Sequence, residues 1–273
     1  MNITGSSILL TGASSGIGAA LAPMLAERGA TVGLVARRRE RLEEVLSSCR
    51  RHAPKSRLWV ADLADIARAE AVAHEAWDAF GGLDALVNNA AMGKRKRVSD
   101  LTPAEIDRVM TLNFTSPMRM GLAVLPGMLA RGSGLIVNVG SVGGRFGIPH
   151  EAAYCAAKFA LSGWSEVMEI DLAGTGVHVK LVLPGPIATE IWGTPEGDIP
   201  PLYQGPFVSA EDCAAGVVAA LESDGFEHYV PEAIPGSYVQ HDFVVEKTKD
   251  PDAFVRQMGE MARGMRGQLT GSA

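Results

Sequence analysis

The sequence predicts a doubly wound α/β fold, in which helices cover both faces of a single parallel sheet. Short apolar runs rich in β-branched residues alternate with longer stretches of helical character along most of the chain. The runs are nearly continuous in apolar residues, which is typical of strands buried on both faces of a sheet. Because no long linker interrupts the alternation, residues 1–230 are interpreted as one domain.

Seven runs are expected to form the strands of this sheet. In chain order they are "SILLTG", "TVGLVAR", "RLWVADL", "LDALVNNA", "GLIVNVGS", "VHVKLVLPG" and the weaker "EHYVPEA". Helices are expected between them, at residues 16–28, 38–50, 65–80, 103–131, 151–174 and 209–222.

Two regions depart from this alternation. Residues 190–207, "EIWGTPEGDIPPLYQGPF", are rich in proline and glycine and predict a long loop, which we interpret as a mobile substrate loop. Residues 231–273 extend beyond the last strand. Four apolar residues recur there at helical spacing: Phe254, Met258, Met261 and Met265. This extension is expected to form an amphipathic helix that packs on the domain or on a partner subunit.

Composition and charge disfavour several classes of function. The chain has 273 residues and a net charge of −6, whereas nucleic-acid-binding proteins are more often basic. Its three cysteines are far apart, so neither a disulfide framework nor a metal site is expected. The first residues do not resemble a signal peptide, and no apolar run reaches the length of a membrane span. A cytoplasmic location is therefore expected.

A glycine-rich turn follows the first predicted strand. In "LLTGASSGIGAALA", Gly12, Gly16 and Gly18 lie between this strand and an amphipathic helix. Glycines allow a tight turn and a close approach to a pyrophosphate, while the helix N-terminus offers free N–H groups. The spacing is G-x-x-x-G-x-G, which differs from the common G-x-G-x-x-G dinucleotide fingerprint.

With this spacing, the chain resembles the short-chain dehydrogenase/reductase family from about residue 5 to residue 222. Further stretches match family motifs in the expected order: "NNAA" at 88–91 with Ala91 in place of glycine, "LNF" around Asn113, Ser141, Tyr154 with Lys158, and "PGPIAT" at 184–189. The resemblance implies a Rossmann-like fold with bound nicotinamide cofactor. It also implies hydride transfer between nicotinamide and a carbonyl or alcohol carbon.

The predicted catalytic residues are Asn113, Ser141, Tyr154 and Lys158. Tyr154 and Lys158 are separated by one helical turn and so share a helix face. An ammonium about 5 Å from a phenolate stabilises it by roughly 3 kcal/mol at an effective dielectric of about 20. Lys158 is therefore expected to lower the pKa of Tyr154 toward neutrality, making it a general acid or base. Ser141 is expected to bond the substrate oxygen, and the resemblance gives Asn113 a role in a water-linked proton relay.

The second strand ends at Ala36, where enzymes that prefer NAD usually carry an acidic residue. Arg37 follows and suits the 2′-phosphate of NADP, whereas Arg38 and Arg39 are interpreted as a solvated start to a helix. The predicted cofactor is therefore NADP. The predicted cofactor-binding residues are Gly12, Ser14, Ser15, Gly16, Ile17, Gly18, Arg37, Asp62, Leu63, Asn88, Ala90, Tyr154, Lys158, Pro184, Gly185, Ile187 and Thr189.

The substrate is less defined by the sequence. Apolar residues in the loop at 190–207 favour a lipophilic carbonyl or alcohol, although they could equally pack the loop down. "KRKR" at 94–97 is interpreted as a solvated basic loop rather than a site for an acidic group. Alternatives to this oxidoreductase are an isomerase or lyase on the same scaffold and an NADPH-binding redox sensor without turnover. The resemblance implies a homodimer or homotetramer joined through residues 103–131 and 151–174.

Overall fold

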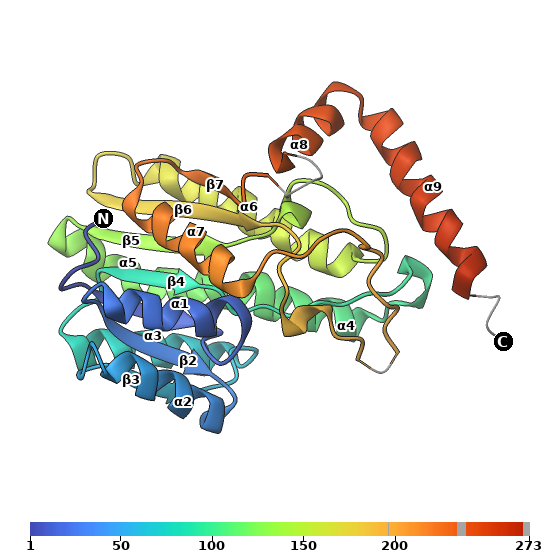
Figure 1. Cartoon of the computed structure of the whole chain (residues 1–273). Coiled ribbons are helices and arrows are strands. Elements are labelled where there is room, and N and C mark those ends of the chain that lie inside the picture. Colours follow the sequence, from blue (N-terminus) through green and yellow to red (C-terminus); the bar gives the residue numbers. More distant parts are fainter. Residues whose placement is uncertain (196, 234–238, 270–273) are drawn as a thin grey trace.

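A computed structural model describes residues 1–195, 197–233 and 239–269 of the chain. Within these ranges, seven parallel strands form one sheet in the order β3-β2-β1-β4-β5-β6-β7. The chain starts at the centre with β1, builds outward to β3, and then crosses to β4 on the other side of β1 (Figure 1). At such a reversal, open α/β sheets generally bind ligands in the crevice outside the carboxyl ends of the strands.

The seven predicted strands are confirmed. They are β1 (Ser7–Thr11), β2 (Thr31–Ala36), β3 (Arg57–Val60), β4 (Ala85–Asn88), β5 (Gly134–Val139), β6 (Val177–Pro184) and β7 (Glu227–Val230). The helices between them are α1 (Gly16–Glu27), α2 (Arg39–Arg50), α3 (Ile66–Phe80), α4 (Pro103–Met110), α5 (Ser116–Arg131), α6 (Ala152–Asp171) and α7 (Ala210–Glu222). The last two described helices are α8 (Gln240–Lys249) and α9 (Pro251–Leu269).

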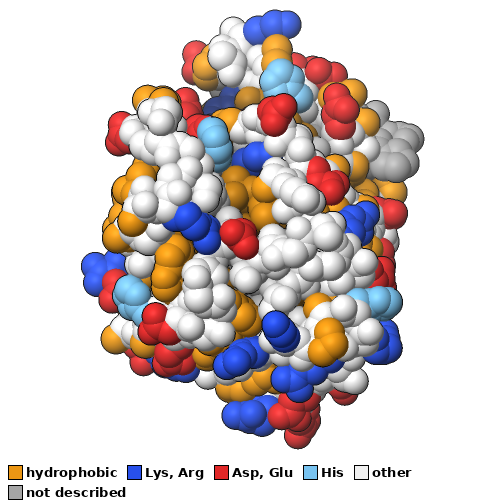
Figure 2. Space-filling model, turned by 90° about the vertical axis from the view of Figure 1, so that its left-hand side faces the viewer, with side chains coloured by type: hydrophobic (Ala, Val, Ile, Leu, Met, Phe, Trp, Pro, Cys, Tyr) orange, Lys and Arg blue, Asp and Glu red, His pale blue; other side chains and the backbone are white. Residues whose placement is uncertain are grey.

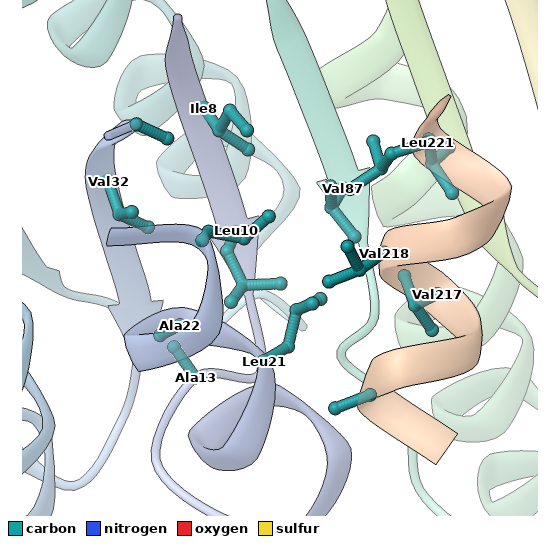
Figure 3. Close-up of a cluster of buried hydrophobic side chains, with 14 of the residues drawn as sticks. Ile8, Leu10, Ala13, Leu21, Ala22, Val32, Val87, Val217, Val218 and Leu221 are labelled. Atoms are coloured by element: carbon teal, nitrogen blue, oxygen red, sulfur yellow. The ribbon is translucent and has the colours of Figure 1, made fainter. Parts of the chain in front are cut away.

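Two apolar layers hold the helices on the sheet. Buried side chains of α1, α2 and α7 pack against one face, and those of α3, α5 and α6 pack against the other. Figure 3 shows the first layer, in which Leu21 of α1 and Val218 of α7 meet Leu10 of β1 and Val87 of β4. These side chains are almost completely inaccessible to water, so the sheet is a rigid support for the loops at its edge.

The long helix expected at 103–131 is interrupted. Helix α4 ends at Met110, a π-helical turn covers Thr111–Thr115, and α5 begins at Ser116. Pro117 explains part of this difference, because proline has no N–H to donate to the carbonyl four residues earlier. That carbonyl belongs to Asn113. The helical periodicity of residues 103–131 continues across this proline, which is why the sequence predicts a single helix there.

The C-terminal residues contain two helices where one was expected. Helix α9 starts at Pro251, directly after α8 ends at Lys249, and proline is favoured in the first turn of a helix. Phe254 of α9 is buried, and its ring lies 5.9 Å from that of Phe146 in the loop after β5. Met261 is largely exposed, and the side chain of Met265 lies outside the described residues.

The surface at the amino ends of the strands, opposite their carboxyl ends, carries mixed charge. Figure 2 shows this face, at the left of Figure 1, with acidic and basic side chains interspersed over it. Two hollows lie there, one of about 850 Å³ beside Thr31 and Arg57 and one of about 570 Å³ beside Asp84 and Lys180. Both are at the amino ends of strands, away from the crevice. Among the described residues, no helix has the length and apolar character needed to cross a bilayer.

Candidate active site

The glycine-rich turn connects β1 to α1 at the carboxyl edge of the sheet. Gly12 has a φ of +68°, a backbone conformation that residues other than glycine rarely adopt. At Gly18, an added Cβ would lie 2.3 Å from the Gly12 carbonyl oxygen, so the start of α1 must be bare of side chains there. Ser15 precedes α1 without bonding its N–H groups through its side chain. This geometry fits the pyrophosphate cradle expected from the sequence.

Thr11 and Asn89 fix the turn to the neighbouring strand. The Thr11 hydroxyl accepts hydrogen bonds from the N–H groups of Asn89, at 2.9 Å, and Ala90, at 3.0 Å. The Asn89 side chain donates to the Thr11 carbonyl at 3.0 Å. Neither Thr11 nor Asn89 was among the predicted site residues. The signal was present, because both are polar residues at the ends of apolar strands.

Asn88 begins a buried chain of polar side chains that leads away from the cofactor crevice. Its Nδ2 donates to Oδ1 of Asn138 on β5 at 2.9 Å, and Asn138 donates to the Ser165 hydroxyl of α6 at 2.8 Å. Ser165 in turn donates to the Leu161 carbonyl. These contacts join β4, β5 and α6, and thereby position the helix that carries Tyr154. The predicted cofactor residue Asn88 thus bonds protein atoms through its side chain.

Ser141, Tyr154 and Lys158 come together at the end of β5. The Nζ of Lys158 donates to the Val139 carbonyl at 2.8 Å and lies 5.8 Å from the centre of the Tyr154 ring. The Ser141 hydroxyl accepts from the Gly143 N–H at 3.0 Å and interacts with the Tyr154 phenol. All three side chains are buried, with Lys158 only 2% exposed.

Burial controls the titration of this group. It raises the pKa of Tyr154 above its ordinary value, although the bond to Ser141 acts in the opposite direction. Burial also lowers the pKa of Lys158 to about 7. The carboxyl of Glu151, at the start of α6, has its pKa raised to about 7 by burial, against the effect of Arg95.

The expectation that Lys158 would lower the pKa of Tyr154 is therefore wrong for the protein alone. The attraction between an ammonium and a phenolate is opposed here by the cost of removing each charge from water. A buried phenol with a raised pKa keeps its proton at neutral pH, which suits a group that donates a proton.

Asn113 lies in the π-helical turn and is 1% exposed. Its Oδ1 accepts from the Met92 N–H at 2.9 Å, and its Nδ2 donates to the Met92 carbonyl at 2.8 Å. The side chain thus clamps the segment that follows β4. Each of its two polar side-chain atoms thus makes one bond to Met92.

The arginines after β2 are exposed but differ in their contacts. Arg37 is exposed, whereas Arg38 directs its Nε and Nη2 toward the Ser14 hydroxyl of the glycine-rich turn, each at 3.4 Å. Arg38 also pairs with Glu190. Arg38 is exposed, as its interpretation as a solvated residue expects, but it also contacts these two partners, and local sequence could not show the pairing because Glu190 lies 152 residues away. Arg39 fits that interpretation, since it is 64% exposed and pairs weakly with Glu43.

The remaining predicted cofactor residues lie around the same edge. Asp62 is exposed and bonds the Ala64 N–H at 3.0 Å, which makes it a turn former, while Leu63 is buried. Pro184 ends β6, and Ile187 is buried. Thr189 touches the glycine-rich turn, because a Cβ at Gly16 would lie 2.8 Å from its methyl group. Ile17 and Ala90 are partly buried beside the turn.

The interpretation of "KRKR" as a solvated basic loop is wrong for Lys94 and Arg95, whereas Arg97 is exposed. Arg95 is 4% exposed, and its guanidinium donates to the carbonyls of Ile191, Gly193 and Ile199. Lys94 lies between Asp198, at 2.5 Å, and Glu105, at 3.0 Å. The first half of the predicted substrate loop is thus tied down by these bonds, which join residues about 100 positions apart.

We expect Arg95→Ala to release this loop. Removing the guanidinium leaves three carbonyls without their donor, so stability should fall by roughly 2–4 kcal/mol. Hydrogen exchange of residues 191–199 should accelerate, as measured by mass spectrometry. Arg97→Ala is the matched control, because Arg97 is 55% exposed and pairs only at the surface with Asp100. Equal exchange in the two variants would show that Arg95 does not hold the loop.

An apolar wall stands beside Ser141 and Tyr154. The loop after β5 packs against β7, α8 and α9 in one cluster, formed by Val142, Phe146, Ile148, Tyr229, Phe243, Val244, Phe254 and Met258. A Cβ at Gly143 would lie 3.1 Å from Ile148 and 3.4 Å from the Tyr154 ring, so this wall adjoins the phenol. The sequence did not indicate it, because its residues come from four separate segments.

Known proteins are similar in sequence to most of this chain. A family model described as short chain dehydrogenase matches residues 6–198. The chain is 38% identical to a 3-oxoacyl-(acyl-carrier-protein) reductase of Vibrio cholerae over 191 residues, which cover 70% of this chain and 77% of that protein. It is 34% identical to a ketoacyl reductase of Nostoc sp. over 183 residues, covering 67% of this chain and 64% of that protein.

Solved structures of similar fold cover nearly the whole chain. A short chain dehydrogenase from Burkholderia cenocepacia in complex with NADP has a TM-score of 0.77 and 28% identity, covering 94% of this chain and 99% of that one. A short chain dehydrogenase/reductase from Burkholderia phymatum in complex with NAD has a TM-score of 0.81. Its identity is 24%, over 93% of this chain and 96% of that one, so it supports the fold alone.

Proposed function

Because this chain belongs to the short-chain dehydrogenase/reductase family, we propose that it is an NADP(H)-dependent oxidoreductase acting on a carbonyl or its alcohol. The observation that carries the proposal is the meeting of Ser141, Tyr154 and Lys158 at the carboxyl end of β5. A bound nicotinamide would supply or accept the hydride. The glycine-rich turn fits its pyrophosphate, because the backbone at Gly12 and Gly18 leaves no room for side chains.

The protein groups divide the proton chemistry among them. Tyr154 holds its proton at neutral pH and is placed to donate it to a carbonyl oxygen as that oxygen gains charge. Ser141 directs a hydroxyl toward the same phenol and would bond the substrate oxygen. Lys158, with a pKa of about 7, can gain and lose a proton near neutrality and would bond the nicotinamide ribose.

Asn113 fits a relay through its backbone carbonyl. Its side chain is bound to Met92, and its carbonyl lacks an α-helical donor because residue 117 is proline. This carbonyl could accept a bond from a water that leads to Lys158. We therefore propose that the relay role of Asn113 belongs to this peptide oxygen.

The preference for NADP is supported by charge at the end of β2. Ala36 leaves no carboxylate to bond the free ribose hydroxyls, and Arg38 reaches the Ser14 hydroxyl of the glycine-rich turn. Arg38, rather than Arg37, is therefore the residue proposed to bind the 2′-phosphate. The choice of NADP as cofactor is further supported by the Burkholderia cenocepacia relative, which was solved in complex with NADP.

A lipophilic substrate is supported by aromatic packing in the loop after Thr189. The rings of Trp192, Tyr203 and Phe207 lie 5.0–6.0 Å apart and form one apolar group. The wall formed by the loop after β5 is apolar as well. A ketone flanked by hydrocarbon is the substrate class that these surfaces fit, in line with the ketoacyl reductases among the relatives.

Self-association through α5 and α6 is also proposed, with the protein in the cytoplasm. Large apolar side chains are exposed on these helices, namely Leu122, Leu129, Phe159, Val167 and Ile170. Such residues are enriched in the cores of homodimer interfaces.

A cofactor titration combined with an activity panel tests the proposal. Wild type should reduce apolar ketones with NADPH and prefer NADPH over NADH by about tenfold to a hundredfold, the effect of one charge-assisted arginine bond. The double variant Ala36→Asp, Arg38→Leu should prefer NADH, because the new carboxylate repels the phosphate. Ala36→Asp, Arg37→Leu should change the preference less. Binding of NADPH without turnover of any ketone or alcohol would favour the redox sensor, or an isomerase or lyase.

A further inference from the structure

We propose that Glu190 sets the strength of the cofactor preference, by competing with the 2′-phosphate of NADP for Arg38 and Arg41. This inference rests on the proposed NADP-dependent function. Cofactor choice is expected to depend on the residues at the end of β2. Glu190 lies outside that segment and outside the glycine-rich turn.

Glu190 is held by two arginines of one helical region. Its Oε2 lies 2.7 Å from the Nη1 of Arg38, and its Oε1 pairs with the Nη1 of Arg41. Both arginines lie at the start of α2, about 150 residues earlier in the chain. The carboxylate therefore engages each guanidinium through a separate oxygen, as a phosphate can.

The pairing lies beside the glycine-rich turn. The nitrogens of Arg38 that do not contact Glu190 face the Ser14 hydroxyl. On the other side, Thr189 is packed against Gly16, so Glu190 starts its 3-10 turn directly next to the same turn. Glu190 thus brings a negative charge to the arginine proposed to bind the 2′-phosphate.

Charge and exposure make the pairing exchangeable. Glu190 is 52% exposed, and Arg38 and Arg41 are 42% and 48% exposed. Exposed ion pairs are weak, because water and salt screen them. The bonds to Arg41 and Arg38 also keep the pKa of Glu190 below its ordinary value, so the competitor stays ionised at neutral pH.

The competition has a direction. The two arginines and Glu190 together carry one net positive charge, and loss of the carboxylate would leave two. A cofactor with a 2′-phosphate must displace Glu190 from Arg38, whereas NADH brings no phosphate to this place. Glu190 therefore weakens NADPH binding and leaves NADH binding nearly unaffected.

The test is calorimetric titration of Glu190→Gln with NADPH and with NADH at fixed ionic strength. NADPH should bind about 3- to 10-fold more tightly than to wild type, while NADH affinity should stay within about 2-fold, as expected for loss of a weak competing pair. The gain for NADPH should shrink when the salt concentration is raised. Glu43→Gln is the matched control, since Glu43 pairs with Arg39 on the same helix and should alter neither affinity.

Two outcomes would overturn the inference. Equal changes for NADPH and NADH would mean that Glu190 only anchors its segment, and weaker NADPH binding would mean that it orients the arginines for the phosphate. The proposed function fails in a different way, namely if wild type binds neither cofactor. A wild type that prefers NADH would remove the cofactor assignment and this inference together.

Discussion

Tyr154→Phe is expected to reduce turnover by about 10²- to 10⁴-fold, the usual contribution of a general acid or base. The change removes one hydroxyl and keeps the ring, which is packed beside Gly143 and Lys158. Affinity for NADPH should therefore stay nearly the same. Steady-state kinetics with a ketone that the wild type reduces measure the turnover. A separate titration measures NADPH binding.

Ser141→Ala provides a graded comparison. It removes a neutral hydrogen bond to the reacting oxygen and leaves the proton donor, so its loss of turnover should be smaller than that of Tyr154→Phe. A Tyr154→Phe variant that retains more than a few percent of wild-type turnover would exclude the acid–base role of the phenol.

Lys158→Met is expected to abolish turnover while making the protein more stable. Lys158 is buried and has its pKa lowered to about 7, so folding at lower pH requires a costly buried charge. The folded protein binds fewer protons than the unfolded chain between about pH 7 and the ordinary lysine pKa. Wild-type stability should therefore rise with pH across this window, and the cost of Lys158 should be fully present below it.

The variant should consequently be more stable by roughly 1–4 kcal/mol at pH 6, with the difference fading above about pH 10. Urea denaturation at several pH values measures this. Lys180→Met is the matched control, because Lys180 is also buried but bonds carbonyls near Ser223, away from the crevice. Lys180→Met should leave turnover intact. A Lys158→Met protein that is less stable than wild type at pH 6 would contradict the account.

The fold could be predicted from the sequence because its signals are local. Each strand, such as "GLIVNV" at 134–139, is an apolar run, and each is followed by a helix that the structure also contains. The position of Ser141, Tyr154 and Lys158 at one strand end follows from that order and from the family resemblance. Their positions could be predicted from their spacing along one loop and one helix alone.

The contacts that the sequence could not indicate all join distant segments. The contacts of Arg95 and Arg38 could not be predicted, because their partners lie about 100 and 150 positions away in the loop after β6. The pKa of Tyr154 was misjudged for a related reason. Burial depends on the whole fold, whereas the distance to Lys158 depends on one helical turn.

The packing of α8 and α9 on the loop after β5 has a consequence for the order of synthesis. Every strand of the sheet, together with Tyr154, leaves the ribosome before these helices do. Until they follow, Phe146 and Val142 have no cover from Phe254 and Met258. A nascent chain at that stage would hold a nearly complete sheet with one apolar surface open to chaperones or to other nascent chains. Synthesis of α8 and α9 thus covers this apolar surface.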